Sequence, residues 1–328
     1  MKYPSIVIGQ SQKMSTVLCR LPNHVGDCCM CLPALRLLEA SGHKIALVGK
    51  RWAGDLMAGM GWRFDPIEGH VFDDLGRMKY LIQNCGAARG LLFPNSLGSA
   101  LLFKLSHLPT AGLATDCRSF FLNVSIPEPK GEMHETERFF YVVHQAIQKW
   151  GEKPAFDVVP ERLGLLSLKR HEAAAKNLIE QFNIPKKFAL LAPVARGKHK
   201  GKVKSWSYFN DLVAPLRELG IEPIVFPSAR EEELAKQACL DATILPPTTL
   251  GNFAAIARRA QIVIANDSGV SHIAAAVGAP QITLVGVTDP KRTRPWNPDA
   301  VVLGSENGWP TVEEVISTMR KVLEHSHG

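Results

Sequence analysis

The stretch Ile264–Pro280, IANDSGVSHIAAAVGAP, contains the sharpest change of character in the sequence. The apolar run QIVIA (261–265) predicts a buried strand, and it ends abruptly at the polar group Asn266–Gly269. The small residues of HIAAAVGAP (272–280) then predict a helix that packs closely on a sheet. Because the loops that follow strands carry the ligand-binding groups of many α/β proteins, this stretch indicates both a fold class and a site.

Two interpretations of the polar group are open. Unpaired N–H groups at the start of a helix, together with the helix dipole, favour an anion. Gly269 would let a diphosphate approach the backbone, and Ser268 and Ser271 would add hydroxyl donors. A phosphate would repel Asp267, so we expect this carboxylate to accept bonds from sugar hydroxyls or to cap the helix. The alternative is that the polar residues, Asn266 included, serve only as a helix cap.

Short apolar runs alternate with amphipathic segments along the rest of the chain. We expect strands at residues 16–21, 44–49, 90–94, 188–192, 222–226, 261–265 and 281–285. We expect helices at 28–40, 95–106, 133–150 and 311–324, and near 206–219, 230–240 and 249–260. Between the two halves, Gly151–Gly164 carries Pro154 and Pro160 and little periodicity, which is typical of a linker.

This alternation predicts the α/β class, with parallel sheets that are covered by helices on both faces. The linker predicts two Rossmann-like domains, residues 1–155 and 156–328. Ligands of such sheets bind beyond the carboxyl ends of the strands. The candidate site is therefore a cleft between two facing domains, lined by the loops after Leu21, Pro94, Leu191, Phe226 and Ala265.

The composition is that of a folded, moderately basic chain. With 328 residues, of which 46% are hydrophobic and 21% charged, it can bury a sizeable core and is not disordered. The net charge of +7 suits phosphates, anionic lipids or nucleic acid, or else reflects ordinary scatter of Lys and Arg. No apolar run reaches the roughly 18 residues that span a bilayer. Cys28, Cys29 and Cys31 lack the paired spacing of a zinc site, so we expect buried thiols and a soluble, cytoplasmic protein.

Two further junctions between strand and helix carry candidate groups. In LPNHVGDCCMCL (21–32), Gly26 predicts a tight turn, and Asp27 is either a helix cap or a general base that faces the cleft. In APVARGKHKGKVKSW (192–206), a basic cluster is either a solvated loop, a nucleic-acid arm or the source of a lysine that neutralises a leaving phosphate. Nothing aromatic interleaves with these lysines to stack bases. The cluster comprises Arg196, Lys198, Lys200, Lys202 and Lys204.

Several ligand signatures are missing from the sequence. GMGWRF (59–64) lacks the last glycine of a dinucleotide fingerprint, and no Walker loop occurs. MHETERF (133–139) lacks the second histidine of a zinc protease. Asp73 and Asp74 are adjacent, so they do not form the D-x-D spacing of a metal-bound diphosphate site. We therefore expect neither a metal nor a cofactor.

Four segments, in this order, resemble bacterial lipopolysaccharide heptosyltransferases, glycosyltransferase family 9. They are GDCCMCLPALRLL (26–38), FPNSLGSALL (93–102), VKSW (203–206) and NDSGVSHIAAAVGAP (266–280). The resemblance covers about residues 18–290. The first domain looks most like heptosyltransferase II through its PNSLGSAL segment, whereas Val270–His272 is similar to heptosyltransferase I.

The resemblance implies a GT-B fold, with the acceptor in the first domain and the nucleotide sugar in the second. It implies inverting transfer of L-glycero-D-manno-heptose from ADP-heptose to the inner core of lipopolysaccharide, with a peripheral contact at the inner membrane and no nucleic-acid partner. Asp27 matches the proposed base of the family, and Lys204 matches the lysine of its K-x-W element. The implied donor-binding residues are Asn266, Asp267, Ser268, Gly269, Ser271 and His272, and the implied acceptor-binding residues are Asn23, Asn95 and Ser96.

The sequence departs from the family pattern at two loops near the expected nucleotide. Val194–Arg196 replaces a P-G-A-E-like turn, and Pro227 replaces a glycine. Glu231, shortly after, is either a ribose contact or a solvated helix start. These departures leave open a GT-B enzyme with another nucleotide sugar, either a different sugar transferase or a nucleotide-sugar epimerase. A non-catalytic protein that binds polyanions is a third alternative, and its binding would be sensitive to salt.

Overall fold

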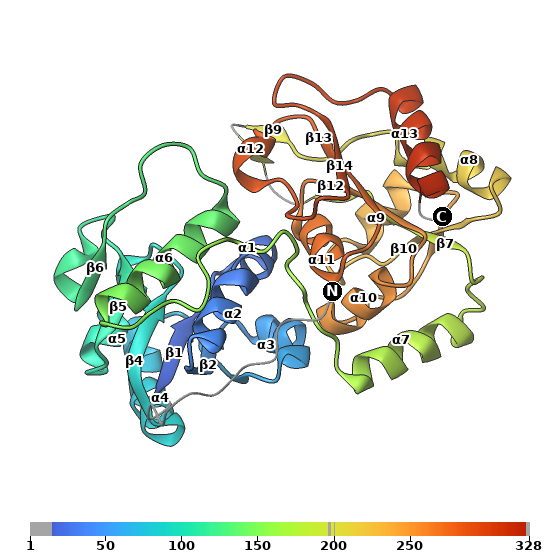
Figure 1. Cartoon of the computed structure of the whole chain (residues 1–328). Helices are drawn as coiled ribbons and strands as arrows, with labels where there is room; N and C mark the ends of the chain where they lie inside the picture. Colours follow the sequence, from blue (N-terminus) through green and yellow to red (C-terminus); the bar gives the residue numbers. More distant parts are fainter. Residues whose placement is uncertain (1–14, 196–197, 200, 326–328) are drawn as a thin grey trace.

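Two parallel sheets with the same strand order form the centres of two domains (Figure 1). The computed structural model describes residues 15–195, 198–199 and 201–325. The first sheet runs β3-β2-β1-β4-β5-β6 and the second β11-β10-β7-β12-β13-β14, and all pairings in both are parallel. Counted within its own half, each order is that of the doubly wound dinucleotide-binding fold. The prediction of two Rossmann-like domains with parallel sheets is therefore confirmed.

The first domain begins with β1 and ends with α6. Its strands are β1 (Thr16–Arg20), β2 (Lys44–Gly49), β3 (Arg63–Pro66), β4 (Ala87–Leu92), β5 (Thr110–Leu113) and β6 (Val124–Ile126). Its helices are α1 (Val25–Met30), α2 (Leu32–Ala40), α3 (Arg51–Met57), α4 (Val71–Cys85), α5 (Leu97–Leu105) and α6 (Glu135–Lys149), with 3-10 turns η1 (Ala58–Met60) and η2 (Arg118–Phe121).

The second domain begins with α7 and adds a small antiparallel pair, β8-β9, to its parallel sheet. Its strands are β7 (Phe188–Ala192), β8 (Lys198–His199), β9 (Lys202–Val203), β10 (Glu222–Val225), β11 (Thr243–Ile244), β12 (Ile262–Asn266), β13 (Gln281–Val285) and β14 (Ala300–Gly304). Its helices are α7 (Lys169–Gln181), α8 (Val213–Glu218), α9 (Glu232–Ala238), α10 (Leu250–Ala257), α11 (Gly269–Val277), α12 (Pro290–Thr293) and α13 (Val312–His325), with the 3-10 turn η3 (Phe209–Leu212).

The central strands explain why the apolar runs of the sequence are continuous. All five residues of β12 are buried, as expected where helices cover both faces of a parallel sheet. Both sheets change winding direction beside their first strand, between β1 and β4 and between β7 and β12. Such a switch point opens a crevice beyond the carboxyl ends of the strands, and the loops after β1, β7 and β12 lie there.

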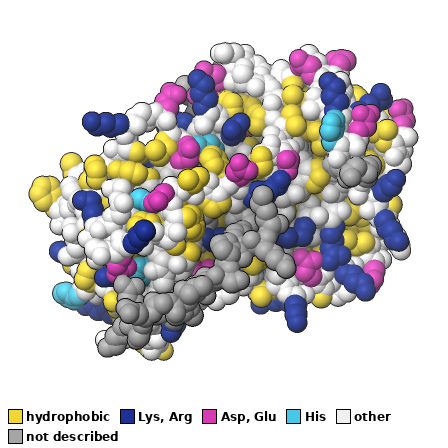
Figure 2. Space-filling view, in the orientation of Figure 1, with side chains coloured by type: hydrophobic (Ala, Val, Ile, Leu, Met, Phe, Trp, Pro, Cys, Tyr) yellow, Lys and Arg dark blue, Asp and Glu magenta, His cyan; other side chains and the backbone are white. Residues whose placement is uncertain are grey.

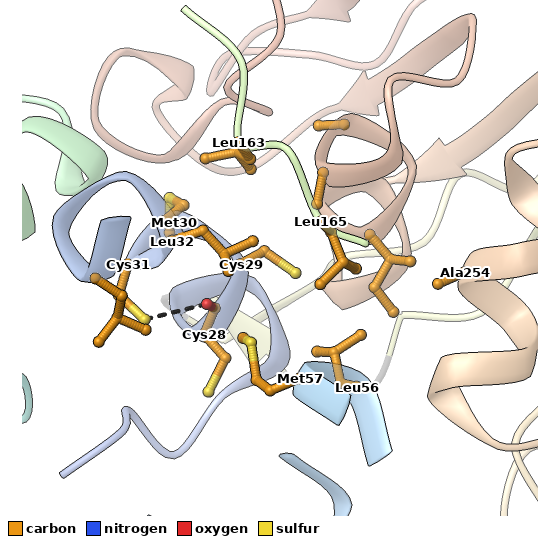
Figure 3. Close-up of a cluster of buried hydrophobic side chains, with 14 of the residues drawn as sticks. Cys28, Cys29, Met30, Cys31, Leu32, Leu56, Met57, Leu163, Leu165 and Ala254 are labelled. Carbon is orange, nitrogen blue, oxygen red and sulfur yellow. Dashed lines mark hydrogen bonds between the residues drawn. The ribbon is translucent and has the colours of Figure 1, made fainter. Parts of the chain in front are cut away.

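One hydrophobic core runs through the contact between the domains. Cys28 and Cys29 of α1 are fully buried, together with Leu163 and Leu165 of the linker and Ala254 of α10 (Figure 3). The expectation of buried thiols is thus confirmed for these two residues and for Cys31, which is also fully buried. The apolar seam joins α1 directly to the second domain, so the two domains pack as one body in this region.

The segment between α6 and α7 contains no helix or strand. It is held from both sides, because Arg36 of α2 donates to Gly164 O (2.8 Å) and Arg258 donates to Leu165 O (2.7 Å). In addition, Leu165 N–H donates to Ala276 O of α11 (2.8 Å). The boundary that we predicted near residue 155 falls within this irregular segment.

The predicted helix at 28–40 is wrong in its bounds. It begins earlier, at Val25, and is interrupted at Cys31, which separates α1 from α2. Pro33 stands in the first turn of α2, where its missing N–H is tolerated, and it could not continue α1 without breaking the hydrogen-bond ladder. Gly26 does not form a tight turn, because it lies within α1 and has no positive φ.

Charged side chains are distributed over the surface. Figure 2 shows Lys and Arg interspersed with Asp and Glu over both domains on the face in view. None of the helices in the described part of the chain combines the length and the apolar character that crossing a membrane would need.

Candidate active site

A cavity of about 580 Å³ lies between the domains. Pockets for small molecules commonly measure roughly 300–1,000 Å³. The start of α1 forms its first-domain wall, and the loops after β7, β10 and β12 form its second-domain wall. The predicted loop after β4 does not reach it. The candidate site residues that line the cavity are Asp27, Lys204, Glu231, Asp267, Ser268, Gly269 and His272.

Asn266 fixes the junction that ends β12. Its side chain is fully buried and does not line the cavity. The amide oxygen accepts from Trp206 N–H (2.9 Å), and the amide nitrogen donates to Pro193 O (2.8 Å). Asn266 therefore ties the end of β12 to the loop after β7 and to the segment that carries Lys204.

Asp267 and Lys204 form an ion pair inside the cavity. Lys204 Nζ lies 3.4 Å from Asp267 Oδ2, and the two side chains are 25% and 12% exposed. Thr288 donates its hydroxyl to the same carboxylate oxygen (2.7 Å). Asp267 is thus held by Thr288 and neutralised by Lys204, which allows a carboxylate to stand beside an anion site. It does not cap α11, because the residue at the N-cap is Ser268.

The first turn of α11 leaves polar atoms without partners. Ser271 donates its hydroxyl to Ser268 O (2.8 Å), so Ser271 stabilises the turn and does not line the cavity. By contrast, Ser268 Oγ is buried and stands opposite the Ser271 N–H in a capping box, but no group in the described part of the chain forms a regular hydrogen bond with it. An unpaired buried polar atom costs about 1–3 kcal/mol. A ligand that bonds to Ser268 would recover this free energy.

His272 carries a second unpaired polar atom in the same turn. The residue is 5% exposed, and within the described residues no group bonds its Nδ1. Burial lowers the pKa of His272 to about 4; Asp267 opposes this shift, whereas His134 and Lys204 add to it. The imidazole is therefore neutral at pH 7 and can donate or accept a hydrogen bond with an uncharged ligand group.

Asp27 faces this turn from the first domain. It stands in the first turn of α1, whose N-cap is His24, and no side-chain bond caps the helix. Burial raises the pKa of Asp27; His24 opposes the shift and the negative charge of Glu135 adds to it. A half-buried carboxylate of raised pKa on a cavity wall suits proton abstraction, whereas the capping role is contradicted.

Part of the cavity lining is apolar. Phe226, Leu250 and Phe253 form this part beside Pro227, the residue that departs from the family pattern. Glu231 stands at the rim and accepts from Ser228 Oγ (2.6 Å). Phe226 and Pro227 follow β10, and the sequence predicts that this loop lines the cleft, whereas Leu250 and Phe253 of α10 were not expected there. Flat apolar walls with one carboxylate suit a nucleobase and a ribose.

The predicted acceptor-binding residues lie outside the cavity. Asn23 Oδ1 accepts from Arg20 (2.7 Å), Asn95 Oδ1 accepts from Arg118 (3.0 Å), and Ser96 Oγ caps α5 by accepting from Ser99 N–H (3.3 Å). Each therefore has a partner within the first domain, and the acceptor-binding role of these three residues stays a prediction.

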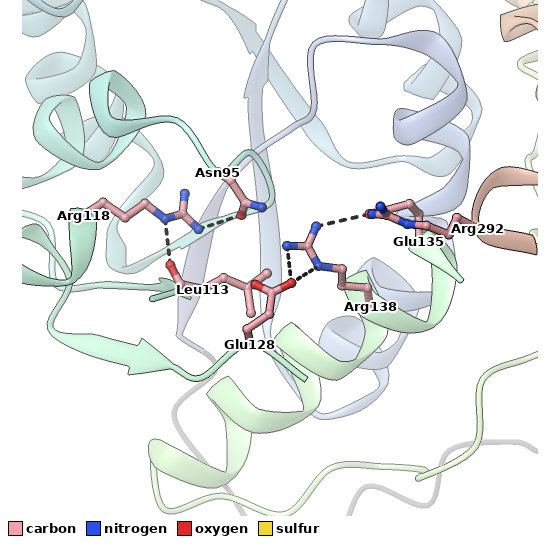
Figure 4. Close-up of polar contacts among 7 residues, drawn as sticks. All are labelled: Asn95, Leu113, Arg118, Glu128, Glu135, Arg138 and Arg292. Atoms are coloured by element: carbon pink, nitrogen blue, oxygen red, sulfur yellow. Dashed lines mark hydrogen bonds and ion pairs between the residues drawn. The ribbon is translucent and has the colours of Figure 1, made fainter. Parts of the chain in front are cut away.

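An ion-pair network joins the domains beside the cavity (Figure 4). Arg292 of α12 pairs with Glu135 of α6 (2.7 Å), and Arg138 lies between Glu128 (2.6 Å) and Glu135 (3.4 Å). His134 Nδ1 accepts from Thr136 N–H, so its Nε2 donates to Arg294 O (2.9 Å) across the domain boundary. These contacts hold α6 against the end of α12, next to the helix that carries Asp27.

Part of the basic cluster lies outside the described residues. Arg196 and Lys200 are not described, nor are the side chains of Lys198 and Lys202, so only Lys204 is placed. Among the residues that the structure describes, no three His, Cys, Asp or Glu side chains are grouped so as to hold a metal ion. The expectation of a reaction without metal or cofactor stays a prediction.

Comparisons with known proteins place both the sequence and the fold in one family. The pattern of Glycosyltransferase family 9 (heptosyltransferase) matches residues 76–321. The chain is 24% identical over 314 residues to lipopolysaccharide heptosyltransferase 2 of Escherichia coli K12, covering 89% of each chain. The solved structure of E. coli ADP-heptose lps heptosyltransferase II has a TM-score of 0.77 at 22% identity, covering 95% of this chain and all of that one.

E. coli heptosyltransferase WaaC with ADP is also similar, with a TM-score of 0.74 at 20% identity and coverage of 94% and 99%. The likeness to both structures confirms the GT-B fold. Because the family pattern covers most of the sequence, the chain belongs to glycosyltransferase family 9, the heptosyltransferase family.

Proposed function

We propose that this enzyme transfers L-glycero-D-manno-heptose from ADP-heptose to the inner core of lipopolysaccharide, with inversion at the anomeric carbon. The observation that carries the proposal is the arrangement of one cavity. Lys204 and two unpaired polar atoms, Ser268 Oγ and His272 Nδ1, lie on its second-domain side, and Asp27 lies on its first-domain side. Heptosyltransferase relatives and an ADP-bound structural neighbour support the choice of donor and acceptor.

The donor would occupy the second-domain wall. The adenine would lie against the apolar part of the wall that contains Phe226 and Phe253, and the ribose hydroxyls would bond to Glu231, which lines the same cavity. The diphosphate would bind at the start of α11, where free N–H groups and the helix dipole favour negative charge. Lys204 supplies the countercharge beside this helix start.

The transfer step follows from the two walls. An acceptor hydroxyl gives its proton to the Asp27 carboxylate while its oxygen forms a bond to the anomeric carbon. The bond from that carbon to the diphosphate oxygen breaks on the opposite face, and ADP leaves with the electron pair. Lys204 and the N–H groups around Gly269 stabilise the charge that develops on the leaving diphosphate.

A contact with the membrane belongs to the same proposal. Large apolar side chains are exposed on the elements that follow β3, β4 and β5 in the chain: Phe72 of α4 (82%), Leu97 of α5 (48%) and Phe120 of η2 (85%). We infer a peripheral contact of these elements with the cytoplasmic leaflet of the inner membrane, where the acceptor is assembled. Flotation with vesicles of acidic phospholipid tests it, because Phe120→Ser should reduce the bound fraction and an unchanged fraction would contradict it.

Thermal unfolding with a panel of nucleotides tests the donor. A ligand at about 100 times its dissociation constant stabilises a fold by roughly 2.7 kcal/mol, which raises the melting temperature measurably. We expect ADP to stabilise the protein more than UDP, GDP, CDP or NAD. Lys204→Ala should weaken the ADP effect, whereas Lys321→Ala, a change of the same kind on the exposed face of α13, should leave it unchanged.

Other outcomes separate the alternatives. Preference for UDP or GDP would retain the fold and contradict heptose transfer. Turnover of the nucleotide sugar without any acceptor would indicate an epimerase or a hydrolase. Binding to every polyanion, lost in salt and without preference for a nucleotide, would indicate a non-catalytic protein.

A further inference from the structure

Helices α1 and α11 lie side by side where the two domains meet (Figure 1). Each carries part of the cavity wall: α1 carries Asp27, and α11 carries the donor loop. Each also has a glycine within its first turn, Gly26 in α1 and Gly269 in α11. Neither glycine has the positive φ that would require this residue type, so another property must explain them.

The missing side chains explain both positions. A Cβ on Gly26 would lie 2.6 Å from His272 Cδ2, and a Cβ on Gly269 would lie 2.9 Å from Val25 Cβ. Both distances are shorter than carbon atoms tolerate without movement. The two contacts are reciprocal, because each glycine of one helix receives a side chain of the other.

We propose that Gly26 and Gly269 are positioning residues, which set the distance between the base on α1 and the donor loop on α11. The inference rests on the proposed function, in which Asp27 acts on an acceptor beside the bound donor. A side chain at Gly26 must displace either the His272 ring or α1 itself. The first response alters the donor loop and the second moves Asp27, so both change the geometry of transfer.

The neighbouring packing leaves little room to relax. Cys28 and Cys29 follow on α1 and are fully buried in the apolar seam with Leu163 and Leu165 (Figure 3). A shift of α1 away from α11 would therefore loosen this seam. Burial raises the pKa of Cys29, so this thiol is unreactive in the packed state. The two cysteines report on the helix contact without any substrate.

Three measurements on Gly26→Ala and Gly269→Ala test the inference. The turnover number should fall about 10²-fold, as expected when reacting groups are misplaced by about 1 Å. The affinity for ADP should fall far less than the turnover number in Gly26→Ala, because the proposed nucleotide contacts lie mostly on the second domain. Alkylation of Cys28 and Cys29, followed by mass spectrometry, should become faster in both variants relative to the exposed Cys117.

The chain offers a matched control and a compensating change. Gly76 lies within α4, and a Cβ there would meet no atom within 4 Å, so Gly76→Ala should alter none of the three readouts. Val25→Gly combined with Gly269→Ala moves the Cβ from one helix to the other. This double variant should recover turnover relative to Gly269→Ala alone.

The results separate this inference from the proposed function. Wild-type turnover in both glycine variants would overturn the inference, as would equal protection of Cys28 and Cys29 in all proteins. A parallel loss of ADP affinity and turnover in Gly26→Ala would also overturn it, because that glycine would then serve donor binding. If the wild-type protein transferred no heptose, the proposed function would fail, and the alkylation rates would still decide whether the glycines set the helix contact.

Discussion

Acidification should destabilise the ligand-free protein through one buried histidine. His272 is 5% exposed, and burial lowers its pKa in the folded state from 6.5 to about 4. In the unfolded chain the imidazole regains a pKa of about 6.5. Between these two values the unfolded state binds more protons than the folded state, so the free energy of unfolding decreases as the pH falls.

The size of this effect follows from the two pKa values. A pKa shift of one unit changes the free energy of unfolding by about 1.4 kcal/mol. Below pH 4 the shift of His272 therefore lowers the free energy of unfolding by about 3 kcal/mol. At pH 5 the unfolded histidine is almost fully protonated and the folded one is not, which gives a loss of about 2 kcal/mol relative to pH 7.5. Above pH 6.5 the contribution of His272 to stability is fully present.

Urea unfolding at several pH values, without nucleotide, measures the effect. Other groups titrate in the same range, so the informative quantity is the difference between the wild type and His272→Gln, which keeps a polar side chain but cannot titrate. We expect the wild type to lose about 2 kcal/mol more than this variant between pH 7.5 and pH 5. If the free energy of unfolding depended on pH in the same way in both proteins, the reasoning would be refuted, because His272 would then have the same pKa in the folded and the unfolded state.

Further predictions concern the base, a buried arginine and the contact of the linker. Asp27→Asn should lower the turnover number by about 10²–10⁴-fold and leave the affinity for ADP intact. In the wild type, the turnover number should fall on acidification with a midpoint above the ordinary aspartate pKa, because burial raises the pKa of Asp27. A pH-independent rate would contradict this role. Arg118→Lys should lower the free energy of unfolding, measured in urea, by about 1–3 kcal/mol. The reason is that Arg118 is fully buried and donates to Leu113 O, Pro94 O and Asn95 Oδ1. An unaltered free energy of unfolding would be inconsistent with this buried network. Gly59→Ala should lower the melting temperature, because its Cβ would collide with Leu166 O of the linker, whereas Gly76→Ala should raise stability by about 0.5–1 kcal/mol. Equal effects of these two changes would show that the linker does not pack against Gly59.

The order of apolar runs was sufficient to predict the two domains. The strands expected at 16–21, 188–192 and 281–285 correspond to β1, β7 and β13, because buried parallel strands leave an unambiguous apolar run. β3 was missed, since Arg63–Pro66 is an edge strand and is mostly only half-buried. α4 was also missed, although the apolar spacing of Val71, Leu75, Met78 and Ile82 fits a helix.

The position of the candidate site was easier to predict from the sequence than the roles of its residues. The junction after β12 could be predicted as a site from its polar residues at a strand end. The function of Asn266 could not, because its partners Trp206 and Pro193 lie some sixty to seventy residues earlier in the chain. Likewise, only the assembled domains show that Gly26 and Gly269 receive side chains from the opposite helix.

The predicted acceptor role of the loop after β4 stays a prediction. Resemblance to the family implied an acceptor contact for Asn95 and Ser96, but the fold gives both side chains partners of their own and places them outside the cavity. A polar side chain at a strand end can serve the ligand or the loop. The distinction depends on neighbours such as Arg118, which no local pattern reveals.

The most direct test of the central claim is the release of ADP from ADP-heptose, measured with and without a heptose-deficient lipopolysaccharide acceptor. The account predicts release only when the acceptor is present, together with a product that is one heptose heavier. It also predicts that Asp27→Asn and Lys204→Ala abolish most of this release while both proteins remain folded. Release of ADP that does not depend on the acceptor, or full activity in either variant, would contradict the account.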